Sequence, residues 1–223
     1  MSEQRALAWG AIFDWDGVVI DSSRQHEGSW ERLAREYGKG LPEGHFKAGF
    51  GRKNEFIIRN LLGWTSDHED VRRLSLRKEE FYRQIVRETG LEPLPGVRTW
   101  LEKLSAAGVP CVIGSSTHRE NLETSLDSLG FRPFFREIVS SEDVSHGKPD
   151  PEVFLKAAEK LGMTPRQCVV FEDAHVGIEA ARRAGMRVIA VATTNALGDL
   201  GKADKSVRRL DELETGEIAK WFE

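Results

Sequence analysis

The chain has 223 residues, of which 39% are hydrophobic and 30% charged, and its formal net charge at pH 7 is −4. This composition predicts a soluble globular protein with a sizeable core, and the negative charge gives no sign of binding to nucleic acid or to an anionic membrane. No apolar run approaches the ~18 residues of a membrane span, and residues 1–9 lack the long apolar stretch of a signal peptide, so we expect a cytoplasmic protein.

Short apolar runs recur along the chain, and helical patterns lie between most of them. The runs are apolar nearly throughout, which fits parallel strands that are covered on both faces. Alternating strands and helices predict an α/β fold with a doubly wound, Rossmann-like parallel sheet. The predicted strands are 6–14, 109–116, 135–143, 168–173 and 186–193, and the predicted helices are 97–107, 119–129, 151–161 and 174–184.

The segment 151–161 carries the clearest helical signals. Asp150 is suited to cap the helix, Pro151 suits its first turn, and Gly162 suits its end. Apolar residues at helical spacing predict one buried stripe, formed by Val153, Phe154, Ala157, Ala158 and Leu161.

One connection is far longer than a crossover in such a fold needs, namely the one from the first predicted strand to the strand at 109. Within it, 22–38 and 70–90 have helical patterns, and Ser22 is placed to cap the first helix. We therefore expect a helical insertion over 20–92 in a core formed by 1–19 and 93–223. The flanking stretches "VVID" and "LEPLPG" suit a hinge.

Side chains with charge or hydroxyl groups follow the predicted strands. In an open α/β sheet, ligands bind beyond the carboxyl ends of the strands, where these groups should converge. Carboxylates bind Mg²⁺, while an ammonium and hydroxyls bind phosphoryl oxygens. The groups predicted at this edge belong to Asp14, Asp16, Ser115, Ser116, Lys148, Glu172 and Asp173.

The segments that carry these residues resemble a known family. "DWDGVVIDS", "VIGSS", "GKPDPEVF" and "FEDAHVGIEAARRAGM" are similar, in order and spacing, to the four motifs of the haloacid dehalogenase superfamily. The helical insertion looks like the type 1 cap of that superfamily, in the clade of β-phosphoglucomutases and sugar-phosphate phosphatases. The resemblance covers almost the whole chain.

The resemblance implies roles for the two aspartates of the first motif. Asp14 matches the nucleophile that attacks phosphorus and becomes an aspartyl phosphate. The carboxylate of Asp16 matches the general acid and base, which protonates the leaving oxygen and then activates water. The side chain of Asp14 and the backbone carbonyl of Asp16 would also be Mg²⁺ ligands.

The other three motifs imply phosphate and metal binding. Ser115 and Lys148 match the phosphate-binding residues, and Ser116 lies next to the first of them. Asp173 matches a metal ligand of the fourth motif, and Glu172 would ligate Mg²⁺ directly or through a water.

Three residues of the insertion match substrate-binding positions of the same clade. At similar offsets, β-phosphoglucomutases carry a histidine, an arginine and a lysine that serve acid/base gating and phosphosugar binding, and here these are His26, Arg52 and Lys78. The alternative is that they are ordinary charges on the solvated faces of helices.

These features predict a Mg²⁺-dependent phosphoryl-transfer enzyme that acts through an aspartyl phosphate. Phosphomonoester hydrolysis on a small phosphorylated metabolite, such as a sugar phosphate, is the base case, and a β-phosphoglucomutase-type mutase is the alternative. A phosphonoacetaldehyde-hydrolase-like enzyme with Lys53 as Schiff-base former is disfavoured, because those enzymes have a small residue in place of Asp16. A non-catalytic phospho-binding module is a further alternative, but a receiver domain is about half this length, has no helical insertion and does not carry its phosphorylated aspartate in a DxD pair on the first strand. We expect a monomer or a weak homodimer.

Two cysteines, Cys111 and Cys168, lie inside apolar runs without an activating base, which predicts reduced thiols in the core. The strand order that the resemblance implies would place their strands on either side of the first strand. They would then be about 10 Å apart, which is too far for a disulfide.

Overall fold

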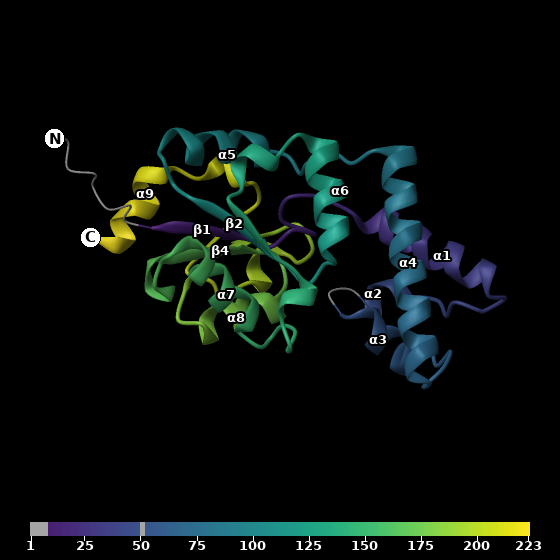
Figure 1. Cartoon of the computed structure of the whole chain (residues 1–223). Helices are drawn as coiled ribbons and strands as arrows, with labels where there is room; N and C mark the ends of the chain where they lie inside the picture. Colours follow the sequence, from purple (N-terminus) through teal and green to yellow (C-terminus); the bar gives the residue numbers. More distant parts are fainter. Residues whose placement is uncertain (1–8, 50–51) are drawn as a thin grey trace.

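The fold is built on one parallel sheet. The computed structural model, drawn in Figure 1, describes residues 9–49 and 52–223. Its six-stranded sheet has the order β3-β2-β1-β4-β5-β6. Every neighbouring pair of strands is parallel, which confirms the predicted α/β fold. The strands are β1 Gly10–Phe13, β2 Cys111–Gly114, β3 Glu137–Val139, β4 Cys168–Glu172, β5 Arg187–Val191 and β6 Lys205–Val207.

Two strands differ from the sequence prediction. Strand β3 is shorter than 135–143 because a turn starts at Ser140, whose backbone N–H donates to the Asp143 carboxylate at 2.7 Å. Strand β6 was not predicted, since it has only three residues and two of them are polar. Residues 6–8 of the first predicted strand lie outside the described part of the chain.

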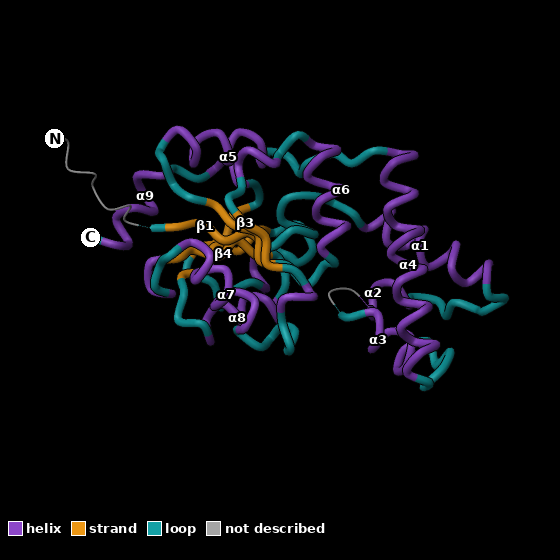
Figure 2. Tube along the Cα trace, viewed as in Figure 1, coloured by secondary structure: helices purple, strands orange, loops and turns teal. Residues whose placement is uncertain are grey.

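Helices cover both faces of the sheet (Figure 2). Alternate residues of β1 pack to opposite sides, with Phe13 in the apolar cluster on one face and Ile12 in the cluster on the other, as the two-residue period of a strand requires. Helices α5 Val97–Ala106, α6 Arg119–Leu129 and α9 Thr215–Ala219 cover the first face, and helices α7 Glu152–Leu161 and α8 His175–Arg183 cover the second.

Helix α7 begins one residue later than predicted. Pro151 occupies the cap position, while the Asp150 carboxylate accepts a hydrogen bond from the backbone N–H of Glu152 at 3.0 Å. Gly162 ends the helix with a left-handed φ of 69°. All the residues of the predicted apolar stripe are buried, so the helical periodicity was a sound guide to the core.

The helical insertion is formed by helices α1 to α4 and lies beyond the carboxyl ends of the strands (Figure 1). It has its own apolar cluster, in which Trp30 and Leu33 of α1 meet Leu74 and Phe81 of α4. The predicted boundaries at 20 and 92 stay a prediction. The helices are α1 Ser23–Glu36, α2 His45–Gly49, α3 Asn54–Phe56, which continues as a π-helical turn Ile57–Leu61, and α4 His68–Thr89.

The two ends of the insertion meet at one point. Ile20 and Pro93 form an isolated antiparallel bridge, and the backbone N–H of Leu94 donates to the carbonyl of Val19 at 2.9 Å. Both stretches that were predicted as hinges therefore lie side by side.

The cysteines match the prediction. Cys111 opens β2 and Cys168 opens β4, on either side of β1, and both are buried free thiols. Burial raises the pKa of each thiol to about 12, so both stay protonated. Within the described residues, no helix is long and apolar enough to cross a membrane.

Candidate active site

A cavity of about 300 Å³ lies between the carboxyl ends of the strands and the helical insertion. Its walls come from both parts of the chain. Every predicted site residue lines it, namely Asp14, Asp16, His26, Arg52, Lys78, Ser115, Ser116, Lys148, Glu172 and Asp173.

Three buried carboxylates meet at the floor of the cavity. Asp14 follows the last residue of β1, Glu172 ends β4, and Asp173 comes next, so parallel strands deliver all of them to one edge. Oxygens of the three side chains lie within 4.8 Å of one another. The ammonium of Lys148 contacts Asp14 at 2.9 Å and Glu172 at 2.6 Å.

One lysine does not neutralise this cluster. Burial, followed by the charges of neighbouring carboxylates, raises the pKa of Asp14 to about 7 and that of Asp173 to about 8, although Lys148 lowers both. Burial alone would lower the pKa of Lys148, but Asp14 and Glu172 hold it above its usual value. Hard oxygen donors with excess negative charge are what a divalent cation such as Mg²⁺ binds, so these residues fit one.

Close packing orients the acidic residues. Glu172 accepts hydrogen bonds from the backbone N–H groups of Asp173 and Ala174 at 2.7 and 2.6 Å. The Thr194 hydroxyl donates to the Asp173 carboxylate. Gly17, in the turn after β1, has φ +85°, and a Cβ there would collide with the Asp173 carboxylate. Glycine is therefore required at this turn for two reasons, its backbone conformation and the space it leaves.

Asp16 has a different environment. Its two oxygens accept hydrogen bonds from the hydroxyls of Ser22 and Thr117, and Nε2 of His26 lies 3.7 Å away. Burial would raise the pKa of this carboxyl, but His26 and the two hydroxyls lower it. Its carboxylate is not part of the group formed by Asp14, Glu172 and Asp173. The expected cap contact of Ser22 is wrong, because its hydroxyl bonds to Asp16 instead of the helix backbone.

The loop after β2 supplies hydroxyl groups. Ser115 is buried, its N–H donates to the Val139 carbonyl at 2.9 Å, and its oxygen accepts from the N–H of Thr117 at 3.2 Å. Ser116 also lines the cavity. The parallel neighbour β3 thus holds this loop against the carboxylate cluster.

Two of the three predicted insertion residues are in direct contact. Nδ1 of His26 lies 2.7 Å from the ammonium of Lys78, and the His26 ring stacks on Tyr82 with centroids 4.2 Å apart. Lys78 is only 2% exposed, so it is not an ordinary solvated lysine of a helix surface.

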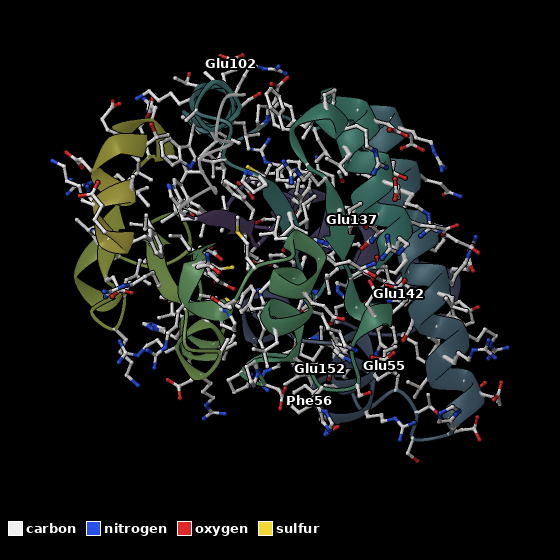
Figure 3. The ribbon with its side chains drawn as sticks, turned by 60° about the vertical axis from the view of Figure 1, so that its left-hand side comes forward. Glu55, Phe56, Glu102, Glu137, Glu142 and Glu152 are labelled. Atoms are coloured by element: carbon white, nitrogen blue, oxygen red, sulfur yellow. The ribbon has the colours of Figure 1, made fainter. Side chains whose placement is uncertain are left out.

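The third, Arg52, contacts a different residue. It is exposed, and its guanidinium covers the ring of Phe56 at 4.5 Å. Figure 3 shows Phe56 and Glu55 of the insertion on the same side of the molecule as Glu142 and Glu152 of the core. Glu55 and Glu142 line the cavity as well, as Arg52 does. Gly51, which precedes Arg52, is outside the described residues.

Several residues of the site were not found from the sequence. Glu79 and Asn121 line the cavity from helices α4 and α6, and both are buried. Their helices give no local signal for this, because polar residues on helices face solvent by default. Thr194 likewise contacts Asp173 from a loop remote in the sequence.

Comparison with known proteins agrees with this geometry. Residues 11–191 match the family described as haloacid dehalogenase-like hydrolase. The chain is similar to the 5-amino-6-(5-phospho-D-ribitylamino)uracil phosphatase of Arabidopsis thaliana, a chloroplast protein, at 39% identity over 98% of this chain. The chain spans 59% of the length of that relative.

Two further matches cover nearly the whole of the similar protein. The fructose-1-phosphate phosphatase of Escherichia coli is 33% identical over 82% of this chain and 95% of the relative. The crystal structure of β-phosphoglucomutase from Clostridium difficile superposes with a TM-score of 0.82 at 25% identity, over 96% of each chain. The chain therefore belongs to the haloacid dehalogenase-like hydrolases, as a phosphatase-type member of the clade that includes β-phosphoglucomutases and sugar-phosphate phosphatases.

Proposed function

We propose that the protein hydrolyses phosphomonoesters of small phosphorylated metabolites, with sugar phosphates as the substrate class, through an aspartyl phosphate on Asp14. The observation that carries this proposal is the pairing of two differently placed aspartates. Asp14 lies buried against Lys148, whereas Asp16 is held by hydroxyls and His26 outside the cluster. This difference supports a role as nucleophile for Asp14 and as proton carrier for Asp16.

Both chemical steps use these two side chains. An oxygen of Asp14 attacks phosphorus and the bond from phosphorus to the ester oxygen breaks. Asp16, whose pKa is low in the free protein, carries a proton in the complex with the negatively charged substrate and gives it to the leaving alcohol. Asp16 then takes a proton from water, whose oxygen attacks the phosphorus of the aspartyl phosphate. Inorganic phosphate leaves and Asp14 is regenerated. Lys148, Ser115 and Ser116 bind the phosphoryl oxygens in both steps.

Mg²⁺ is the proposed cofactor. The side chains of Asp14 and Asp173 and the backbone carbonyl of Asp16 would hold it, with Glu172 directly or through a water. When bound, Mg²⁺ offsets the negative charge of the carboxylates and of the phosphoryl group, so that the two can approach. The raised pKa values of Asp14 and Asp173 are consistent with a cluster that is completed by a cation.

Activity should require Mg²⁺, and Ca²⁺ should inhibit. Calcium accepts more ligands and a looser geometry, so it would occupy the carboxylates without holding the Asp14 oxygen in place. Turnover of p-nitrophenyl phosphate with each ion, and the melting temperature with and without chelator, measure this. Full activity in excess chelator would contradict the metal scheme.

The substrate is proposed from the clade and the cavity. The relatives named above act on phosphorylated derivatives of a ketose and of a ribityl chain. The contact of His26 with Lys78 beside Asp16 favours a phosphomutase as the second candidate, since the same groups would bind a sugar hydroxyl that competes with water.

A metabolite screen decides between these reactions. It should contain fructose 1-phosphate, 5-amino-6-(5-phospho-D-ribitylamino)uracil and β-glucose 1-phosphate, the last with and without glucose 1,6-bisphosphate. Release of phosphate supports the phosphatase. Formation of glucose 6-phosphate that depends on the bisphosphate, without phosphate release, would favour the mutase and contradict hydrolysis as the main reaction.

A Schiff-base enzyme and a non-catalytic module have less support than these two reactions. Lys53 lines the cavity, but Asp16 is present, which still disfavours Schiff-base chemistry. A non-catalytic module would have no need for the aspartate pair beside the helical insertion. The monomeric or weakly dimeric state and the cytoplasmic location stay predictions.

Replacing Arg52 with alanine should impair turnover of a phosphorylated sugar far more than that of p-nitrophenyl phosphate. Arg52 is an exposed residue that lines the cavity, where a guanidinium can bind the distal oxygens of a sugar phosphate, and p-nitrophenyl phosphate has no such groups. KM should rise, and kcat should fall if this contact drives closure. Small, parallel changes on both substrates would remove Arg52 from the site.

A further inference from the structure

Glu79 lies at the junction between the helical insertion and the core. It is on α4, lines the cavity and is buried. Its Oε1 accepts hydrogen bonds from the side-chain amide of Asn54 at 2.6 Å and from the ammonium of Lys78 at 3.0 Å. Its Oε2 accepts a hydrogen bond from the side-chain amide of Asn121, on core helix α6.

This carboxylate therefore joins three elements. Oε1 faces α3, which begins at Asn54 directly after Arg52 and Lys53, and it also faces Lys78. Oε2 faces the core. All the groups around it donate, so only an ionised acid accepts from every one of them. Burial would raise the pKa of Glu79, but the charge of Lys78, followed by those of His26 and His118, holds it at about 2.

Asn121, the partner of Glu79 on the core, is also held in one orientation. Asn121 is buried, and its side-chain carbonyl accepts a hydrogen bond from Nη1 of Arg83 at 3.1 Å. Arg83 also contacts Glu120 at 2.9 Å. Arg83 of α4 thus orients the side-chain amide of Asn121 so that its NH₂ group points at Glu79 of the same helix. Turning this amide over would lose both hydrogen bonds.

We propose that Glu79 is a positioning residue that joins the closed helical insertion to the core through Asn121 and, in that state, holds Lys78 and the Arg52–Asn54 segment over the substrate. This inference rests on the proposed function, because it assigns Glu79 a task in phosphoryl transfer. Glu79 acts through its neighbours and takes no part in the chemistry. A charged group that forms hydrogen bonds to both sides of the junction in the closed state lowers the free energy of that state relative to an open state.

The substitution Glu79→Gln tests this because it replaces one of the two acceptor oxygens with a donor NH₂ group. Glutamine accepts with one end and donates with the other, so it presents its NH₂ group either to the NH₂ of Asn121 or to Asn54 and Lys78. A buried donor without an acceptor should lower kcat/KM for the sugar phosphate found in the screen by about tenfold. p-Nitrophenyl phosphate, which does not reach the distal part of the cavity, should be affected much less.

Adding Asn121→Asp should restore the pattern. In Glu79→Gln/Asn121→Asp, the glutamine NH₂ donates to the new carboxylate, its carbonyl accepts from Asn54 and Lys78, and Arg83 keeps its acceptor. The net charge of the junction is unchanged. Asn121→Asp alone would place two carboxylates face to face and should be impaired, so the double variant must be better than either single one. Should Glu79→Gln fail to fold, recovery of folding and activity in the double variant is the same test.

Hydrogen–deuterium exchange separates the junction from the chemistry. Peptides from 54–61 and from 119–129 should exchange faster in Glu79→Gln and return to the wild-type rate in the double variant. Glu80→Gln is the matched control: Glu80 is the next residue of α4 and pairs with Arg77 at the surface at 2.7 Å, so it should change neither exchange nor kinetics.

The outcomes are distinct. Wild-type exchange and kinetics in Glu79→Gln would overturn the inference, as would a double variant no better than the single ones. Equal losses on both substrates together with a lower melting temperature would indicate a general structural role and also overturn it. Absence of phosphatase activity in the wild-type protein would contradict the proposed function, while exchange would still decide whether Glu79 joins the insertion to the core.

Discussion

Replacing Asp14 with asparagine should abolish turnover while leaving the fold intact. The amide has the same shape, but it is a poor nucleophile, so the loss should be on the order of 10⁴-fold or more, as when a nucleophile is removed from other enzymes. The apo protein should be at least as stable as the wild type. Asp14 is buried beside other carboxylates, which raises its pKa to about 7, so removing its charge relieves repulsion.

Three measurements check this expectation. Steady-state turnover of p-nitrophenyl phosphate reports activity, circular dichroism with a melting curve reports folding, and mass spectrometry of acid-quenched protein reports the aspartyl phosphate. Asp127→Asn, the same change at an exposed position of α6, is the control and should behave as wild type. Substantial activity of Asp14→Asn in a preparation free of deamidated protein would contradict the nucleophile assignment.

Replacing Asp16 with alanine should slow turnover by roughly 10²- to 10⁴-fold, the usual contribution of general acid–base catalysis. The size of the loss should depend on the leaving group. An alkyl phosphate needs its leaving oxygen protonated, whereas p-nitrophenolate leaves with little help, so the alkyl ester should suffer more. The substitution also removes the acceptor of Ser22 and Thr117, so a melting curve must accompany the kinetics.

A comparison of the two esters across a pH series is the measurement. The excess loss for the alkyl ester should shrink as pH rises, because Asp16 of the wild-type protein is itself less protonated there. Since His26 and two hydroxyls hold the pKa of Asp16 below its usual value in the free protein, this decline should begin at acidic pH. An equal loss for both esters at every pH would argue that Asp16 only positions its neighbours.

Much of the core fold follows from local patterns in the sequence. The apolar runs around Ile12, Val112 and Val170 predict buried strands, because a strand covered on both faces has no polar side. Strand β6 has no such signal. It lies at the edge of the sheet, has only one fully buried residue, Val207, and is defined by its pairing with β5. Its existence depends on a neighbour, which a local pattern does not contain.

The residues at the floor of the site were predictable because the strands that carry them were. Parallel strands bring Asp14, Lys148 and Asp173 to one edge whatever the details of packing, so the topology suffices to place them together. The junction of the insertion with the core is different. Glu79 and Asn121 meet only because α4 packs against α6, and the angle between two helices that are far apart in sequence is set by tertiary contacts.

Ser22 shows a second limit of prediction from local sequence. A serine ahead of a helix predicts a cap, and Ser22 does occupy that position. A better acceptor is available, since the Asp16 carboxylate lies within reach of its hydroxyl, and a bond to a charged group is the stronger one. Local propensity thus gave the correct position for this residue and the wrong partner.

The bridge between Ile20 and Pro93 has a consequence for how often the site is covered. Because both ends of the insertion are attached at one point, any movement of the insertion relative to the core would be that of a tethered body with few degrees of freedom, unlike that of a free loop. The side chains of the insertion are then present at the strand ends at a high effective concentration, so weak contacts suffice to keep the site covered. Inserting glycines into one side of this attachment would lower that effective concentration, although no residue on the facing surfaces of the insertion and the core would change.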